Sequence, residues 1–172
     1  MAGAAHLVKR FFGSILPIGP RAADRTWALE QLLPGEQDVW RQMSATDRRH
    51  AAGVARRVQS QLGDQATRPV LAAALLHDCG KTVSGLGTGG RVIATLSGTW
   101  AGNARGVEWR ERRGFTRRVG LHLDHPRLGG ELLGQAGSAP LTVAWATEHH
   151  LPPEDWTVPL PIGEALKAAD DD

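Results

Sequence analysis

The sequence is poor in the residues that stabilise secreted proteins or build sulfur-rich metal sites. Cys79 is the only cysteine among 172 residues, so the chain has no intrachain disulfide and no zinc site built from several cysteines. Tyrosine is absent, and aromatic residues make up 5% of the chain, which excludes a tyrosine nucleophile. A single cysteine suits a reducing compartment, and we therefore expect a cytoplasmic protein.

Long apolar runs and a strong net charge are missing too. No run approaches the roughly 18 to 20 apolar residues that a membrane-spanning helix needs, and Lys9 and Arg10 interrupt the N-terminal segment where a signal peptide would be apolar. The formal charge of +2 is too small to indicate nucleic-acid binding by itself. The remaining composition is typical of a soluble globular protein, and the length suits one domain with a sizeable core.

Apolar residues recur at helical spacing along most of the chain, which predicts an all-α fold without strands. Ser44 is a good N-cap residue, and Pro69, Pro140 and Pro161 suit the first turn of a helix. Pro34-Gly35 is expected to end the second helix. We expect helices over about residues 4–15, 24–33, 37–43, 45–62, 70–78, 91–102, 125–137, 140–150 and 161–170.

Two segments allow more than one interpretation. Residues 4–15 form an amphipathic pattern, which favours a helix docked on the core over a peripheral contact with a membrane surface. The arginine-rich residues 105–118 are typical of a solvated helix face, although arginine also suits phosphate groups. Glycines at residues 85–90 match a dinucleotide-binding loop only in spacing, because no buried strand leads into them.

Several histidines and aspartates lie at predicted helix ends or on predicted apolar faces. A buried imidazole or carboxylate is costly unless something binds it, and so many of them together indicate a metal site. Nitrogen and oxygen ligands without thiolate suit iron, manganese, zinc, nickel or magnesium. The candidate ligands are His50, His77, Asp78, His125, His149, His150 and Asp170.

These residues carry a resemblance to a known family. His50, the His77-Asp78 pair in Ala-Leu-Leu-His-Asp-Cys-Gly-Lys and the later Asp170 resemble the HD domain of metal-dependent phosphohydrolases. In that family a histidine, a His-Asp pair and a distant aspartate hold a metal within a compact helical bundle. The resemblance implies a single HD-like domain over residues 44–172, a packed N-terminal helical extension over 1–43, and a glycine- and arginine-rich insertion at about 83–120.

The match extends toward the HD-GYP branch of the family. His125-Pro126 and the pair His149-His150 resemble elements that complete a two-metal site there, with Asp78 able to bridge the ions. The family's GYP motif is absent, since Leu-Pro-Pro-Glu-Asp-Trp follows the paired histidines. Specificity for cyclic di-GMP is therefore not implied.

The resemblance implies hydrolysis of a phosphomonoester, nucleotide or phosphodiester with one or two divalent ions. Asp78 and Lys81 are the expected catalytic residues, with Lys81 facing the substrate phosphate, and Arg117 and Arg118 are candidate substrate contacts. The partner would be a phosphorylated small molecule or a nucleotide. The alternative is a non-catalytic HD-like module that senses a nucleotide or docks a partner and uses the metal only structurally.

Overall fold

The central element of the molecule is α5 (Arg68–Leu76), whose residues Val70 to Leu76 are all buried. A computed structural model describes residues 18–87, 90 and 108–172. The other elements are α2 (Ala22–Glu30), α3 (Pro34–Gln42), α4 (Ala45–Leu62), α8 (Gly114–Leu123), α9 (His125–Gln135), α10 (Pro140–Glu148), α11 (Leu160–Asp171), and the 3-10 helices η1 (Gly63–Gln65), η2 (Cys79–Ser84) and η3 (Pro153–Asp155). The described residues form one all-α domain without strands, as the sequence predicts.

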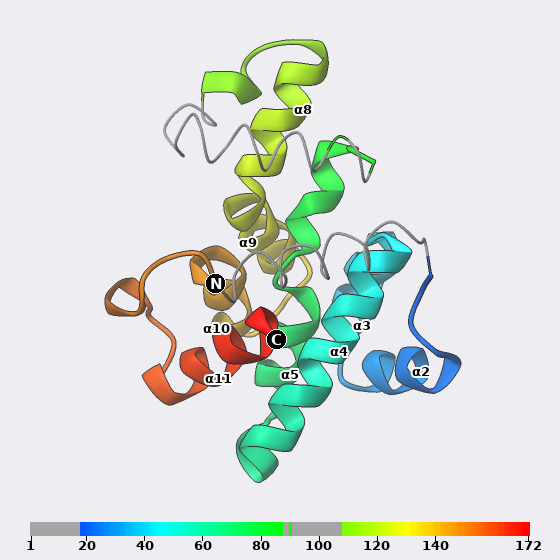
Figure 1. Cartoon of the computed structure of the whole chain (residues 1–172), viewed down its shortest axis with the longest axis vertical. Helices are drawn as coiled ribbons and strands as arrows, with labels where there is room; N and C mark the ends of the chain where they lie inside the picture. The colour runs from blue at the N-terminus through cyan, green and yellow to red at the C-terminus, as the bar shows by residue number, and fades with distance from the viewer. Residues whose placement is uncertain (1–17, 88–89, 91–107) are drawn as a thin grey trace, which may run out of the picture.

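Helices on several sides enclose α5. α4 and α10 pack directly against it, α3 touches it, and α11 lies against α4 (Figure 1). Ala72, Ala73 and Ala74 are fully or almost fully buried, and their small side chains allow these neighbours to approach closely. An alanine- and leucine-rich helix therefore has no solvent-facing side along most of its length, which places its C-terminal end in the interior.

Local signals explain where α4 begins and ends. The Ser44 hydroxyl accepts a hydrogen bond from the Asp47 N–H at 3.1 Å, which caps the first turn. Val54, Ala55 and Val58 face the core, and the helix ends where Gly63 adopts a φ of 53°. Both ends agree with the prediction, and His50 lies on the second turn of this helix.

The prediction for Pro34-Gly35 is wrong. α2 already ends at Glu30, and Pro34 begins α3 instead of terminating α2. Proline is well tolerated there because the first helical N–H has no intrahelical partner. The Glu36 carboxylate accepts a hydrogen bond from the Leu33 N–H at 2.8 Å and completes this helix start.

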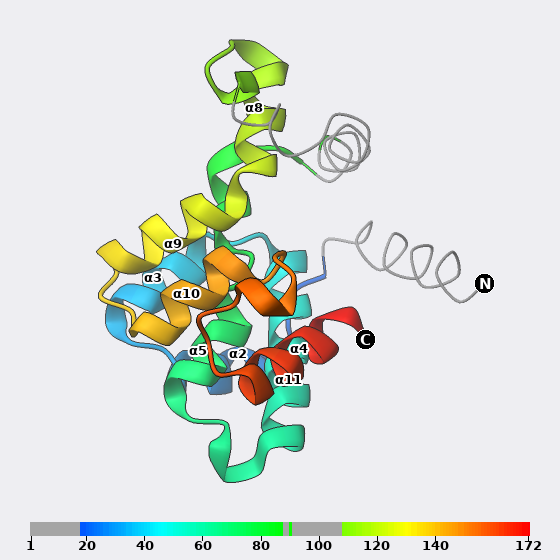
Figure 2. The ribbon, with the colours of Figure 1, turned by 90° about the vertical axis from the view of Figure 1, so that its left-hand side faces the viewer.

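The α8 helix extends away from the other helices (Figures 1 and 2). Its contacts with the segment after α5 form a small second apolar cluster of Leu86 and Val119, with Trp109 and Leu123 against them. α8 begins only at Gly114, where φ is 61°, so the described part of the arginine-rich run 105–118 is not one helix. The predicted end of the insertion, residue 120, falls inside α8.

The predicted N-terminal extension is partly described. Ala28, Leu32 and Trp40, from α2, α3 and the turn between them, belong to the same apolar core as α4 and α5. The segment 4–15 and the expected helix 91–102 lie outside the described residues.

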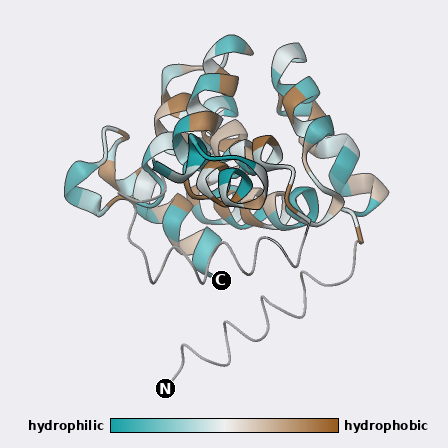
Figure 3. Ribbon diagram, turned by 90° about the horizontal axis from the view of Figure 1, so that it is seen from above, coloured by the Kyte–Doolittle hydropathy of each residue, from teal (hydrophilic) through white to brown (hydrophobic). Residues whose placement is uncertain are grey.

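Hydrophobic and hydrophilic residues occur together on the same helices in Figure 3. Among the helices of residues 18–87 and 108–172 none could cross a bilayer.

Candidate metal centre

The site is organised around the end of α5. His77 follows the last helical residue and keeps a helical backbone, and Asp78 then leaves the helix with φ −98° and ψ 6°. Both side chains are buried, His77 with 2% of its side chain exposed and Asp78 with 10%. The apolar helix therefore delivers an imidazole and a carboxylate into the interior, where each needs a partner.

The Asp78 carboxylate lies between histidines from different helices. Its Oδ1 atom is 3.3 Å from Nε2 of His125 and 3.7 Å from Nε2 of His149. Its Oδ2 atom is 3.5 Å from Nε2 of His77 and 2.5 Å from Nζ of Lys81. Each carboxylate oxygen thus faces a different group of nitrogen atoms.

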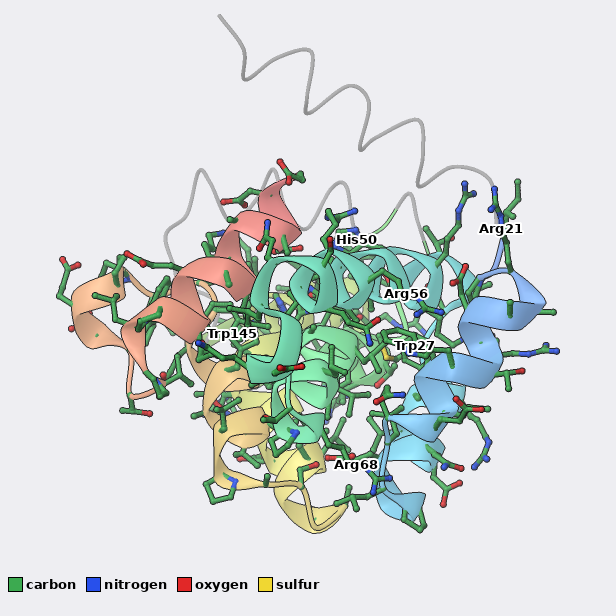
Figure 4. The ribbon with its side chains drawn as sticks, turned by 90° about the horizontal axis from the view of Figure 1, so that it is seen from below. Arg21, Trp27, His50, Arg56, Arg68 and Trp145 are labelled. Carbon is green, nitrogen blue, oxygen red and sulfur yellow. The ribbon has the colours of Figure 1, made fainter. Side chains whose placement is uncertain are left out.

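One ligand group lies on the Oδ2 side of Asp78 and consists of His50, His77 and Asp170. Nε2 of His50 is 2.8 Å from Oδ1 of Asp170, and Nε2 of His77 is 3.5 Å from the same oxygen. One ligand atom from each residue lies within 4.8 Å of the others. Figure 4 shows His50 on α4 close to α11, which carries Asp170.

A second ligand group lies on the Oδ1 side and consists of His125, His149 and His150, again with one ligand atom each within 4.8 Å. The ring centre of His150 is 4.0 Å from that of His149 and 5.2 Å from that of His125. His125 and His149 are buried, whereas His150 is exposed. This group therefore has one ligand at the protein surface, through which an ion could enter.

Three buried histidines are held in the same orientation. The Nδ1 atoms of His77, His125 and His149 lie 2.9, 2.7 and 3.0 Å from the backbone carbonyl oxygen three residues earlier. A carbonyl only accepts, so Nδ1 carries a proton, and whenever the ring is neutral its lone pair lies on Nε2. This pattern is typical of histidines that bind metals.

The three Nε2 atoms find no hydrogen-bond partner among the described residues, although they are buried. Leaving one such atom unsatisfied costs about 1–3 kcal/mol, and three of them converge on the oxygens of Asp78. A divalent ion bound by nitrogen and carboxylate oxygen would satisfy all three. The side chains present therefore fit a metal centre with one or two ions.

Electrostatics at the centre favour a bound cation. Burial by itself would raise the pKa of Asp78, but the Lys81 ammonium and the His77 ring outweigh it and hold that pKa well below its usual range. Burial opposes protonation of His77, yet the Asp78 and Asp170 carboxylates raise its pKa. Burial lowers the pKa of His149, which keeps this ring neutral and its lone pair available. The carboxylates remain ionised and attract positive charge.

A backbone contact at Gly80 brings His125 to Asp78. A Cβ atom at Gly80 would lie 2.0 Å from the carbonyl oxygen of His125 and 2.6 Å from the N atom of Gly129. The first turns of α9 therefore rest directly on the backbone of η2. The sequence suggests that Gly80 permits a turn. Its φ is not positive, so the backbone conformation does not require glycine there. Its main role is to allow the close approach of α9.

Lys81 and the two candidate arginines occupy different places. Nζ of Lys81 contacts Asp78 at the centre. Arg117 and Arg118 are exposed on α8, the helix that extends away from the others (Figure 2). The structure does not bring these arginines into the ligand cluster.

Other polar residues near the ligands serve the fold. Asp124 pairs with Arg110 and Arg127, and Glu148 accepts hydrogen bonds from the backbone and hydroxyl of Thr157. Cys79 is fully buried, and burial raises the pKa of its thiol to about 12. Cys79 is thus a core residue and not a nucleophile.

All seven predicted ligands lie in one cluster at the ends or on the inner faces of α4, α5, α9, α10 and α11. Two supports of the cluster were not predicted from the sequence, namely the close contact at Gly80 and the carbonyl groups that orient the histidines. Both are backbone contacts, which no residue type in the sequence signals. Comparison of the chain with protein-family models, curated proteins and solved structures found no match. Metal binding by the cluster stays a prediction.

Proposed function

We propose that the protein is a metal-dependent phosphohydrolase of the HD type. Its substrate would be a phosphomonoester, a nucleotide or a phosphodiester in the cytoplasm. The observation that carries the proposal is the Asp78 carboxylate, whose two oxygens face two separate groups of ligand atoms at 3.3–3.7 Å. Such a carboxylate could bridge two ions, and two neighbouring ions can stabilise both the attacking and the leaving oxygen of a displacement at phosphorus.

The ligands divide between two ions. His50, His77 and Asp170 would hold one ion and His125, His149 and His150 the other, with one Asp78 oxygen for each. Bound divalent ions supply Lewis-acid activation of water and neutralise charge on a phosphoryl group. The protein's part is to present Nε2 lone pairs, to keep the carboxylates ionised and to bury most of the ligands, with His150 exposed and the His50 side chain 33% exposed.

Lys81 adds a mobile positive charge at the same place. Its ammonium group is 2.5 Å from Oδ2 of Asp78, and its side chain is 23% exposed. When an ion competes for that oxygen, the flexible side chain can turn outward and contact a phosphate oxygen instead. Lys81 would then stabilise the charge that builds up on the transferring group.

The direct test measures metal content and turnover together. The purified protein is loaded with Mn²⁺ or Fe²⁺, its metal is quantified, and a panel of phosphomonoesters, nucleotides and phosphodiesters is assayed. We expect two ions per chain and hydrolysis of at least one class, with activity lowered at least about 100-fold in Asp78→Asn. The control Asp38→Asn changes an exposed carboxylate on α3 and should keep full activity.

The result that would overturn this function is a metal-loaded protein that hydrolyses no member of the panel. A second candidate function would then apply, a metal-stabilised module that senses a nucleotide. The observation that favours it is the ion pair between Lys81 and Asp78. In this pair the Lys81 ammonium is engaged by a ligand carboxylate and does not face a substrate phosphate. Nucleotide binding without turnover, measured by calorimetry, would identify this module.

A further inference from the structure

An open hollow of 230 Å³ lies between the start of α2 and the outer face of α4. Arg49, Ala52, Gly53 and Arg56 form its α4 wall, and the helical spacing of these residues puts them on one face. Pro20, Arg21 and Asp24 form the opposite wall. Figure 4 shows Arg21 at the start of α2 and Arg56 on α4, where the two helices lie against each other.

The hollow is separate from the metal centre. His50, Val54 and Arg57 lie about 100° around α4 from the face that carries Arg49, Gly53 and Arg56, because successive residues of an α-helix turn by that angle. None of the seven candidate metal ligands is among the described residues that line the hollow. A ligand in the hollow would therefore contact none of the metal ligands.

Positive charge dominates the lining. Three of the described lining residues are arginines, and Asp24 is the single acid among them. Asp24 lies 3.5 Å from Arg56 and neutralises part of the charge, which leaves an excess of about two positive charges. An excess of this size matches a dianion, such as a phosphate group at neutral pH.

Arg56 is already held in position. Its guanidinium carbon lies 3.7 Å above the ring centre of Trp27, and this stacking restrains the side chain. Nη1 also donates a hydrogen bond to Oε1 of Gln59 at 3.3 Å, and Nε pairs with Asp24. A preorganised guanidinium loses less conformational entropy when it binds an anion. Stacking on Trp27 therefore makes Arg56 a better anion ligand than an unrestrained arginine on the surface.

Gly53 keeps the hollow open. It lies in the middle of α4, where glycine is less favourable than alanine, and its φ is not positive. A Cβ atom there would meet only the end of Arg57, at 3.5 Å, so the packing does not demand glycine. The absent side chain deepens the floor between Arg49 and Arg56.

From these observations we propose that the hollow binds a phosphoryl group, either free orthophosphate or the phosphate of a small ester. Its volume is below the roughly 300–1,000 Å³ of sites for drug-sized ligands, which suits one phosphate group. Arg21, Arg49 and Arg56 supply the charge. This site does not depend on the proposed hydrolase function.

The test is calorimetric titration of orthophosphate into the full-length protein in chloride buffer, once with chelator and once with Mn²⁺. Glycerol 3-phosphate is titrated in parallel, and the tighter of the two ligands distinguishes free from esterified phosphate. We expect a saturable one-to-one event that does not require Mn²⁺. Arg56→Gln should weaken it about 10-fold or more, and Gly53→Leu should abolish it by filling the floor.

Matched variants separate this site from general charge and from the metal centre. Arg25→Gln removes an exposed arginine one turn along α2 that does not line the hollow, and binding should be unchanged. Lys81→Gln should also leave the Mn²⁺-independent event unchanged. The proposal is overturned if no saturable event occurs, if Arg25→Gln weakens it as much as Arg56→Gln, or if it requires Lys81 or Mn²⁺. Circular dichroism checks that each variant is folded.

Discussion

Replacement of Gly80 by alanine is expected to damage the second ligand group while it leaves the first in place. The added Cβ would lie 2.0 Å from the carbonyl oxygen of His125 and 2.6 Å from the N atom of Gly129. Both are backbone atoms of α9, so no side-chain rotation can relieve the overlap. Either α9 or η2 must move.

The required movement is large compared with the tolerance of a metal site. Real Cβ contacts essentially never fall below 3.0 Å, so the His125 carbonyl must retreat by about 1 Å. Metal–ligand distances tolerate about 0.2 Å. Because His125 belongs to the displaced turn, its Nε2 atom should leave its place beside Asp78. Overpacking of this kind costs about 1–3 kcal/mol, or a melting temperature about 2–12 °C lower for a chain of this length.

Two measurements on Gly80→Ala check this reasoning, with Gly129→Ala as the control. Metal analysis should find one ion per chain instead of two, and thermal unfolding should show the lower melting temperature. Gly129 lies across the same contact, but a Cβ there would meet Gly80 and Cys79 at 3.4–3.5 Å, which is ordinary van der Waals contact. Gly129→Ala should therefore keep both ions and nearly the wild-type stability.

A Gly80→Ala protein with two ions and an unchanged melting temperature would refute the close backbone contact between η2 and α9. Loss of both ions together would contradict the division of the ligands into two groups. Loss of stability with both ions retained would show that His125 can follow Asp78 despite the overlap.

Three further predictions concern the ligands and the core. Chelator should lower the melting temperature by about 10 °C, because ions present at about 1,000 times their dissociation constant stabilise the folded state by about 4 kcal/mol; an unchanged value would mean that no ion links the helices. Arg57 donates two hydrogen bonds to the Ala169 carbonyl at 2.7 and 2.9 Å and so positions Asp170. Arg57→Met should therefore weaken metal binding about 10- to 100-fold, measured in competition with a chromogenic chelator. Arg41→Met, which changes an exposed arginine, should leave metal binding unchanged. Cys79 should react with iodoacetamide at least about 100-fold more slowly in the native protein than in guanidinium chloride, since it is fully buried and its pKa is raised to about 12; equal rates would show that the end of α5 is open.

Helix positions were largely predictable because their signals are local. Ser44 caps α4, Pro69 lies in the first turn of α5, and Pro140 begins α10, as expected. Pro34 was misassigned because proline is compatible both with the end of one helix and with the first residue of the next. The choice depended on Glu36, whose carboxylate completes the start of α3.

The ligand residues could be named from the sequence, because histidine and aspartate at the ends of apolar helices need a partner wherever the chain folds. Their division into two groups could not be derived from periodicity or spacing. It depends on contacts between residues that are distant in the sequence. His50 and Asp170 are 120 positions apart in the chain, yet Nε2 of His50 lies 2.8 Å from Oδ1 of Asp170. Only the packing of α11 on α4 decides that contact.

The sequence by itself determined the all-helical fold of the described residues, a buried α5 and a set of nitrogen and oxygen ligands, because each follows from local composition and side-chain chemistry. The tertiary structure alone decided that Gly80 serves as a contact surface for α9, that each Asp78 oxygen faces a different ligand group, and that Arg21 meets Arg49 and Arg56 across a hollow. These features join segments that are distant in the chain, and no local pattern encodes the distance between two helices.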